Sequence, residues 1–225
     1  MWWIATARIG ADEAPGDVQT GVRLREYRQL RRVVVVVLVA VAVLAVAGVG
    51  VTVLSVPVRG DSMEPALEPG DRVLARPADS ADLERFAVVI GQFGANSADV
   101  VKRVIGLPGD RISIEKFGVG DGTVRIQPGG TGPWFVVANP SWNGRWKQVA
   151  SNCCTGEGKE APRPTEQLIP AGMLFVLGDN IGASDDSRRN GWMPARLVRQ
   201  VAGWRVYPPT RLGAIENPAI LTPAP

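Results

Sequence analysis

An uninterrupted apolar run at residues 33–56 constrains the fold of this chain more than any other feature. Its 24 residues, VVVVVLVAVAVLAVAGVGVTVLSV, carry no charge. As a helix, the run would span roughly 36 Å, which is enough to cross a hydrocarbon core of about 30 Å. The sequence therefore predicts one transmembrane anchor, and no second run of this kind occurs in the 225 residues.

The charges on either side of this run predict its orientation. Only Arg59 follows the run closely, whereas five arginines precede it: Arg23, Arg25, Arg28, Arg31 and Arg32. The positive-inside rule then places the N-terminus in the cytoplasm and the larger C-terminal part outside. A cleaved signal peptide is the alternative, because Ala45-Val46-Ala47 has a small-x-small pattern. The apolar run continues well beyond Ala47, so an uncleaved anchor is the preferred interpretation.

Composition excludes several kinds of chemistry. Two of the three net positive charges lie in residues 1–32, and the nearly neutral remainder argues against a nucleic-acid partner. The chain has no histidine, so it cannot form a Ser-His-Asp triad, a Cys-His dyad or a metal site with histidine ligands. Its two cysteines, Cys153 and Cys154, are adjacent and cannot form a four-cysteine zinc site. A vicinal disulfide and a pair of thiols both remain open.

The part of the chain after the anchor is predicted to be mostly β. Short runs rich in β-branched residues are bounded by Gly, Pro or Asp at 73–75, 87–90, 100–105, 112–114, 124–126, 173–177 and 201–206. A turn at 120–122 predicts a hairpin between the fourth and fifth runs. We expect a polar tail over 1–32, the anchor over 33–56 and an extracytoplasmic domain over 57–207. Within that domain, residues from about 113 to 168 form a smaller β insertion. The proline-rich residues 208–225 are expected to be irregular.

A lysine amine is one of the few groups that can activate a serine without histidine. In the run VVKRVI at 100–105, a period of two places Lys102 on the face of Val100 and Val104. If that face points inward, loss of hydration lowers the pKa of the amine, as a general base requires. A surface lysine on an edge strand is the alternative. Ser113-x-x-Lys116 also matches a short serine–lysine pattern, but it lies in a strand-like run without the accompanying motifs.

The serine candidate is Ser62, in the segment GDSMEPAL at residues 60–67. Gly60 and Pro65 bracket it in a stretch that is neither helix nor regular strand, and such a stretch can present a hydroxyl and a backbone N–H together. The alternative is an ordinary turn serine. Six residues separate Ser62 from the end of the apolar run, so its hydroxyl is expected within about 20 Å of the membrane surface.

Four segments resemble, in order, the conserved boxes of bacterial type I signal peptidases. GDSMEPAL at 60–67 resembles the box S-x-M-x-P-T-L, and PGDRVL at 69–74 resembles the next box, G-D-x-V. KRVIGLPGD at 102–110 resembles the lysine box, and GDNIGASDDSRRNG at 178–191 matches G-D-N-x-x-x-S-x-D-S-R-x-x-G. The resemblance extends from residue 33 to about 207. It implies a signal-peptidase-like β catalytic domain with a smaller β insertion.

The resemblance also implies roles for individual residues. Ser62 would be the nucleophile and Lys102 the general base. Ser184 would hold and orient the lysine amine. The Ser62 N–H would contribute to the oxyanion hole, and Gly60 stands where some family members add a side-chain hydroxyl. Ala66 and Ile181 also depart from the usual family residues.

A network of ion pairs is expected to brace this site. The resemblance implies that Asp186, Arg188 and Arg103 form it. Asp185 and Asp186 could instead suggest a cation site, but adjacent residues on a loop point apart and arginines follow closely. No metal and no cofactor are expected.

The function implied is that of a membrane-anchored serine endopeptidase. It would remove signal peptides from exported preproteins after a small-x-small motif, at the outer face of the bacterial plasma membrane, with signal peptides and membrane lipid as partners. A self-cleaving repressor relative with the same Ser-Lys chemistry is disfavoured by the anchor and by the absence of a DNA-binding segment. A non-catalytic, membrane-tethered β binding module is the alternative from another class.

Tryptophan is abundant, with seven residues in the chain. Indole favours the membrane–water interface. We therefore predict a membrane-facing or substrate-facing role for the aromatic cluster of the insertion, which comprises Trp134, Phe135, Trp142 and Trp146. For Trp204, core packing and a membrane-facing role are left equally open.

Overall fold

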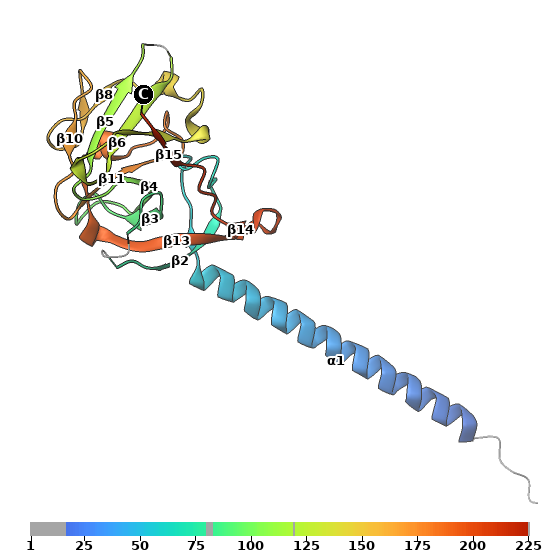
Figure 1. Ribbon diagram of the computed structural model, residues 1–225. Helices are drawn as coiled ribbons and strands as arrows, with labels where there is room; N and C mark the ends of the chain where they lie inside the picture. The colour runs from blue at the N-terminus through green and yellow to red at the C-terminus, as the bar shows by residue number, and fades with distance from the viewer. Residues whose placement is uncertain (1–16, 80–82, 119, 225) are drawn as a thin grey trace, which may run out of the picture. The chain divides into compact units, whose positions relative to one another are not determined.

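The computed structural model describes residues 17–79, 83–118 and 120–224 (Figure 1). The chain divides into two compact units, Met1–Val53 and Leu54–Pro225. The first unit contains almost all of one long helix. The second unit contains two β-sheets and all the candidate site residues.

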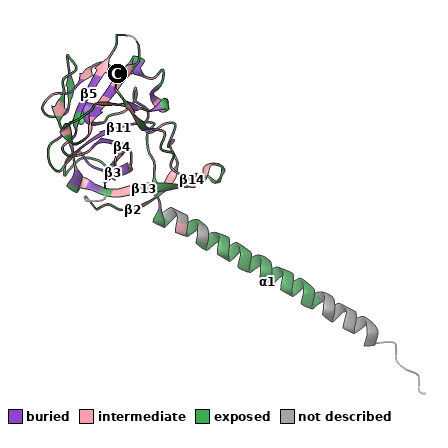
Figure 2. Ribbon diagram, in the orientation of Figure 1, coloured by how far each residue is buried: buried purple, intermediate pink, exposed green. Residues whose placement is uncertain are grey.

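The long helix α1 runs over Asp17–Leu54. Its segment Tyr27–Gly50 is long and apolar enough to cross a membrane, and the large apolar side chains described there are exposed (Figure 2). The helix begins before the predicted anchor because the segment RLREYRQLRR at 23–32 consists mostly of helix-forming residues. It ends at Leu54 rather than at Val56, because the residue before a proline disfavours helical angles. Residues 1–16 of the predicted tail lie outside the described residues.

The first sheet of the second unit carries the candidate catalytic residues. Across the described residues it has eight antiparallel strands in the order β1-β2-β13-β3-β4-β11-β12, with β14 paired to β13. The strands are β1 (Val56–Pro57), β2 (Arg72–Pro77), β3 (Val88–Gly91), β4 (Val100–Gly106), β11 (Met173–Leu177), β12 (Met193–Pro194), β13 (Val198–Tyr207) and β14 (Gly213–Ala214). β4 lies inside the sheet between β3 and β11, which explains why five of its seven residues are buried.

The second sheet contains most of the predicted insertion. In the described part of the chain it has seven strands, ordered β15-β7-β6-β5-β8-β9 with β10 paired to β5. The strands are β5 (Arg111–Lys116), β6 (Gly122–Gln127), β7 (Phe135–Ala138), β8 (Asn152–Cys153), β9 (Glu160–Ala161), β10 (Gln167–Leu168) and β15 (Ile220–Pro223). Ile114 pairs with Val124 across β5 and β6, so the predicted hairpin is confirmed.

The proline-rich tail is less irregular than expected. Residues 220–223 form β15, which extends the second sheet by pairing with β7, and residues 213–214 form β14 on β13. The expectation of irregular backbone is therefore wrong for these two segments. Proline is tolerated in β15 because this strand lies at the edge of the sheet. Leu221 also packs against the core, which fixes the strand.

The tryptophans of the insertion lie mainly in the core of the second sheet. Trp142 and Trp146 are each 3% exposed, and their rings meet edge to face at 6.1 Å. The predicted membrane-facing role is therefore wrong for these two residues, because short 3-10 turns direct their indoles inward. Trp134 and Phe135 are half-buried. Trp204 on β13 is 51% exposed.

Cys153 and Cys154 form a disulfide in the same core. Both residues are buried. The structure thus selects the vicinal disulfide from the two states that the sequence left open.

Candidate active site

Lys102 lies in the middle of the buried strand β4. Its exposed fraction is 4%, and it faces Val89 of the neighbouring strand β3 in the sheet register. The alternative of a surface lysine on an edge strand is therefore excluded. Burial lowers the pKa of the Lys102 ammonium below its ordinary value, because the charged form loses hydration. This effect outweighs the opposing effect of nearby carboxylates, of which Asp186 is the strongest, followed by Asp185.

Ser62 lies on the loop that joins β1 to β2. The loop is held against the last sequence box by two hydrogen bonds from Asn180. The Asn180 backbone N–H donates to the carbonyl of Ser62 at 3.0 Å, and its Nδ2 donates to the carbonyl of Asp61 at 3.1 Å. The loop also bends sharply at Gly60, whose φ of +74° is a conformation that glycine adopts without strain.

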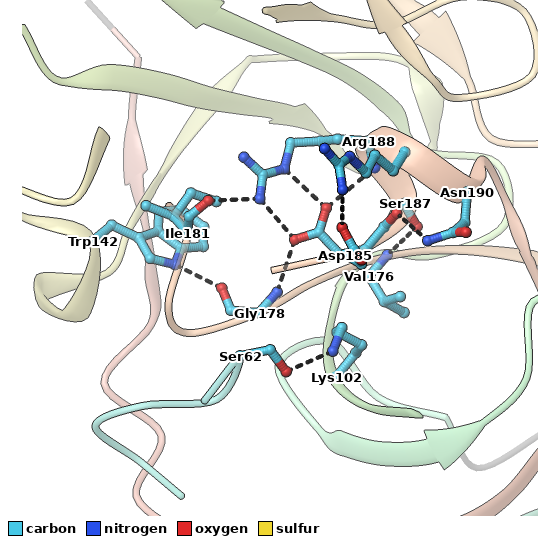
Figure 3. A network of polar contacts seen from close by, with 12 residues as sticks. Ser62, Lys102, Trp142, Val176, Gly178, Ile181, Asp185, Ser187, Arg188 and Asn190 are labelled. Carbon is cyan, nitrogen blue, oxygen red and sulfur yellow. Dashed lines mark hydrogen bonds and ion pairs between the residues drawn. The ribbon is translucent and has the colours of Figure 1, made fainter. Parts of the chain in front are cut away.

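The structure brings Ser62 and Lys102 into direct contact, although 40 residues separate them in the chain (Figure 3). Lys102 Nζ donates hydrogen bonds to Ser62 Oγ at 2.8 Å and to the carbonyl of Val101 at 3.0 Å. A nucleophile and base within about 2.6–3.2 Å of each other satisfy the geometric condition for proton transfer. The pair can therefore exchange a proton without rearrangement of the backbone.

Ser184 lies beside this pair but does not contact the lysine amine. Its hydroxyl is the one buried side-chain oxygen without a hydrogen-bond partner in the described parts of the chain. A Cβ placed on Gly178 would collide with both Ser184 Oγ and the Ser62 carbonyl, so these atoms pack on the same glycine. Ser184 is thus close to the nucleophile loop, while the expected bond to Lys102 is not formed in this structure.

Asp186 and Arg188 form a buried ion pair, as expected. Arg188 Nη2 lies 2.8 Å from Asp186 Oδ2, and Arg188 Nε donates to Oδ1 at 2.9 Å. The same guanidinium donates to the carbonyl of Ile181, and Asp186 accepts from the Gly178 N–H at 3.2 Å (Figure 3). This pair therefore ties the two ends of the 178–188 loop together.

Arg103 belongs to a different ion pair from the one expected. Its guanidinium makes two bonds to Asp179, at 2.8 and 2.6 Å, and both side chains are almost fully buried. The expectation that Arg103 joins Asp186 is wrong, because the sequence does not show which side chain of the last box faces β4. Asp179 belongs to the matched segment GDN, so the motif itself was the signal that could have identified it.

Two further residues, from the segment that follows β7, brace this loop. Trp142 Nε1 donates to the carbonyl of Gly178 at 3.1 Å (Figure 3), and Asn139 Nδ2 donates to Asp179 at 3.3 Å. Neither residue lies in a sequence box. The sequence had singled out Trp142 only for a membrane-facing or substrate-facing role, and no pattern pointed to Asn139. The segment after β7 therefore supports the 178–188 loop directly.

The remaining candidates from the sequence take no part in these hydrogen bonds and ion pairs. Asp185 is exposed and pairs with Arg189 at 2.6 Å, so it points away from the buried Asp186. Ser113 and Lys116 lie on β5 in the second sheet. Their separation of three residues places them on opposite faces of that strand, which excludes a mutual contact within it.

An open cleft of about 760 Å³ reaches the dyad. Both Ser62 and Lys102 line it. Its other walls combine aliphatic, small and charged residues: Val56, Pro57, Arg59, Gly60, Asp61, Ile90, Ala98, Asp99, Val100, Val101, Ala183, Asp185 and Gln200. The cleft can take an extended peptide that passes its backbone over the serine hydroxyl.

Comparisons with known proteins relate this chain to signal peptidases. A family model described as "Signal peptidase, peptidase S26" matches residues 30–207. Signal peptidase IB of Staphylococcus aureus (strain COL) is 28% identical over 158 residues, which cover 67% of this chain and 76% of that protein. Signal peptidase I of Bacillus caldolyticus is 30% identical over 154 residues, covering 67% and 78% respectively. A crystal structure of a signal peptidase I from Enterococcus faecalis V583 is 26% identical, with a TM-score of 0.36, and covers 53% of this chain and 96% of that one.

Proposed function

Because this chain belongs to the signal peptidase S26 family, we propose that it is a membrane-anchored serine endopeptidase that removes signal peptides from exported preproteins. Ser62 is the nucleophile and Lys102 the general base. The observation that carries this proposal is the 2.8 Å hydrogen bond between Lys102 Nζ and Ser62 Oγ, made by an amine that burial drives towards its neutral form.

The first half of the reaction forms an acyl-enzyme. The neutral Lys102 amine accepts the proton of the Ser62 hydroxyl, and Oγ attacks the scissile carbonyl carbon. The Ser62 N–H donates to the oxyanion that develops. The ammonium of Lys102 then returns its proton to the leaving nitrogen, so the mature protein departs with a free amino terminus and the signal peptide remains esterified to Ser62.

The second half repeats these proton transfers with water. Lys102 accepts a proton from water, which attacks the ester carbonyl. The Lys102 ammonium then returns this proton to Ser62 Oγ as the ester bond breaks, which releases the signal peptide with a carboxyl terminus and restores the hydroxyl. Ser184 is proposed to orient the amine during these steps. Its support is its position beside Gly178 and a buried hydroxyl that is free to accept from Nζ when Ser62 Oγ is engaged with substrate.

The walls of the cleft support a preference for small and apolar residues on the signal-peptide side. Gly60, Ala98 and Ala183 leave room beside the nucleophile, and Val100 and Val101 give an aliphatic wall. The proposed specificity is cleavage after a small-x-small motif. We also propose that the N-terminus is cytoplasmic and the catalytic unit lies outside the plasma membrane, because the arginines precede the apolar segment.

The proposed function is tested by adding the full-length protein, solubilised in detergent, to a purified preprotein. We expect a shortened product whose new N-terminus follows a small-x-small motif, as read by N-terminal sequencing. A preprotein with a bulky residue immediately before the cleavage site should be left intact. Failure of the active protein to cleave several different preproteins would refute this function.

A further inference from the structure

A second hollow continues from the catalytic cleft beyond Ser62. It has a volume of about 340 Å³ and is lined by Asp61, Gly144, Arg145, Lys147, Gln148, Asn180 and Ala183. Asp61 and Ala183 also line the catalytic cleft, so the two hollows meet at the loop that carries the nucleophile. A peptide that fills the cleft and continues past Ser62 therefore has a path into this second hollow.

The second hollow carries an excess of positive charge. Arg145 and Lys147 line it together with a single carboxylate, that of Asp61. Neither of the two basic side chains makes an ion pair or a hydrogen bond within the described ranges of the chain. Arg145 is partly buried and Lys147 is exposed, so both charges remain available to a ligand.

The loop that carries these two cations packs closely against the 178–188 loop. Trp146, which lies between them in sequence, is buried in the core of the second sheet, and Trp142 donates to the Gly178 carbonyl. Any side chain at position 182 would collide with the Arg145 carbonyl, so Gly182 permits close approach of the two loops. The cations are therefore held at a fixed place relative to Ser62.

We propose that Arg145 and Lys147 form a subsite for an acidic side chain of the preprotein, on the mature side of the scissile bond. This inference rests on the proposed function. Val100 and Val101 line only the catalytic cleft, whereas Arg145 and Lys147 line only the second hollow, so we assign the apolar signal-peptide side to the cleft and the mature side to the second hollow. A carboxylate is the peptide group that complements two unpaired cations. An extended chain advances at most about 3.6 Å per residue, so the first three mature residues are within reach.

The experiment compares three peptide substrates that differ only in one early mature residue, which is Glu, Gln or Lys. Each of the first three mature positions is varied in turn, in detergent without lipid, so that lipid headgroups cannot contribute. For the wild-type protein we expect kcat/KM to be about three- to tenfold higher for Glu than for Lys at one of these positions, as for ion pairs near a surface. The preference should shrink at about 1 M salt, where the Debye length is about 3 Å.

Variants assign the preference to the two cations. In Arg145→Gln/Lys147→Gln the ratio of Glu to Lys substrates should fall to about one, and in Arg145→Glu/Lys147→Glu it should invert. Arg163→Gln and Lys159→Gln are the matched controls, since these exposed residues line neither hollow, and they should keep the wild-type ratio. A wild-type ratio of one at all three positions, or a ratio that survives the double substitutions, overturns the subsite. Failure to cleave even the Gln peptide would instead refute the proposed function, and the subsite with it.

Discussion

Lys102 is subject to two opposing electrostatic effects. Burial in β4 disfavours its ammonium form, whereas the nearby carboxylates favour it, and burial is the larger of the two. The result is an amine whose pKa is lowered while it remains within hydrogen-bonding distance of Ser62. A general base needs both properties, because the neutral amine must be populated and must be able to reach the hydroxyl proton.

The lowered pKa of Lys102 predicts how cleavage depends on pH. As pH falls through this pKa, the amine becomes protonated and can no longer accept the Ser62 proton. We therefore expect kcat/KM to decrease on acidification, with a slope corresponding to one proton. On the alkaline side, kcat/KM should already be constant at a pH where an ordinary lysine is still protonated, because the pKa of Lys102 is lowered. Initial rates measured across a pH series would test this. A rate independent of pH through the acidic range would contradict it.

Stability should respond to Lys102 with a definite sign. Its pKa is lower in the folded state than in the unfolded chain, so the unfolded chain binds more protons between the two values and unfolding becomes more favourable as pH falls. Lys102→Met should remove this dependence, keep or raise the free energy of unfolding near neutral pH, and abolish cleavage. Urea titrations at several pH values measure the free energy of unfolding of both proteins. A Lys102→Met protein that is markedly less stable than wild type would show that burial of the Lys102 amine does not cost stability.

At the scale of elements, two buried ion pairs secure the loop between β11 and the short helix α2 (Ser187–Asn190). Asp179 pairs with Arg103 of β4, while Asp186 pairs with Arg188 and also bonds the Gly178 N–H. One pair connects the loop to the first sheet, and the other closes the loop on itself. The 178–188 loop is thus held both to β4 and within itself by buried charged groups.

Removal of one partner from the buried pair should be costly. In Asp179→Asn, Arg103 keeps its charge in a site that is almost fully buried, and such a change typically costs about 3–5 kcal/mol. Asp185→Asn is the matched control, because the exposed Asp185–Arg189 pair should contribute less than about 1 kcal/mol. Denaturant unfolding of both variants provides the comparison. Equal losses of stability would contradict the assigned roles of these pairs.

The sequence predicted the strands and the dyad better than it predicted the contacts between elements. The turn at 120–122 correctly indicated a hairpin. The period of two around Lys102 left an inward and a surface position open, and the resemblance to the lysine box favoured the buried position that the structure shows. The partner of Arg103 and the burial of Trp142 depend on how the two sheets and the 178–188 loop pack, and this is a long-range property. The strand at Ile220–Pro223 was missed for a related reason, because its pairing with β7 overrides a composition that locally favours irregular structure.

At the scale of the whole molecule, one exposed and mostly apolar patch on the catalytic unit is a candidate for contact with lipid. Leu74 and Trp204 are 40% and 51% exposed and line one shallow hollow with Ala75, Arg76, Val201 and Gly203. Because Trp142 and Trp146 are buried, we expect the aromatic contact with the membrane at the exposed Trp204 of β13. An indole at this position suits the membrane–water interface.

This patch predicts that a protein of residues 54–225 still binds lipid vesicles without helix α1. Tryptophan fluorescence should shift to the blue on binding, and Leu74→Ser/Trp204→Ser should weaken binding. Trp142→Phe is the control, since this residue is buried and should not change vesicle affinity. Absence of binding at every lipid composition tested would show that the anchor alone holds the enzyme at the membrane.

The central claim is that Ser62 and Lys102 act as one catalytic unit, and a double-mutant cycle on preprotein cleavage tests it most directly. Rates are measured for the wild type, Ser62→Ala, Lys102→Ala and the double variant, with circular dichroism to verify that each is folded. Each single substitution should reduce kcat by at least about a thousandfold, and the double variant should be no slower than either single variant. Lys102→Arg should be equally inactive, because a guanidinium remains protonated. Substantial cleavage by any folded variant, or losses that add in the double variant, would contradict the account.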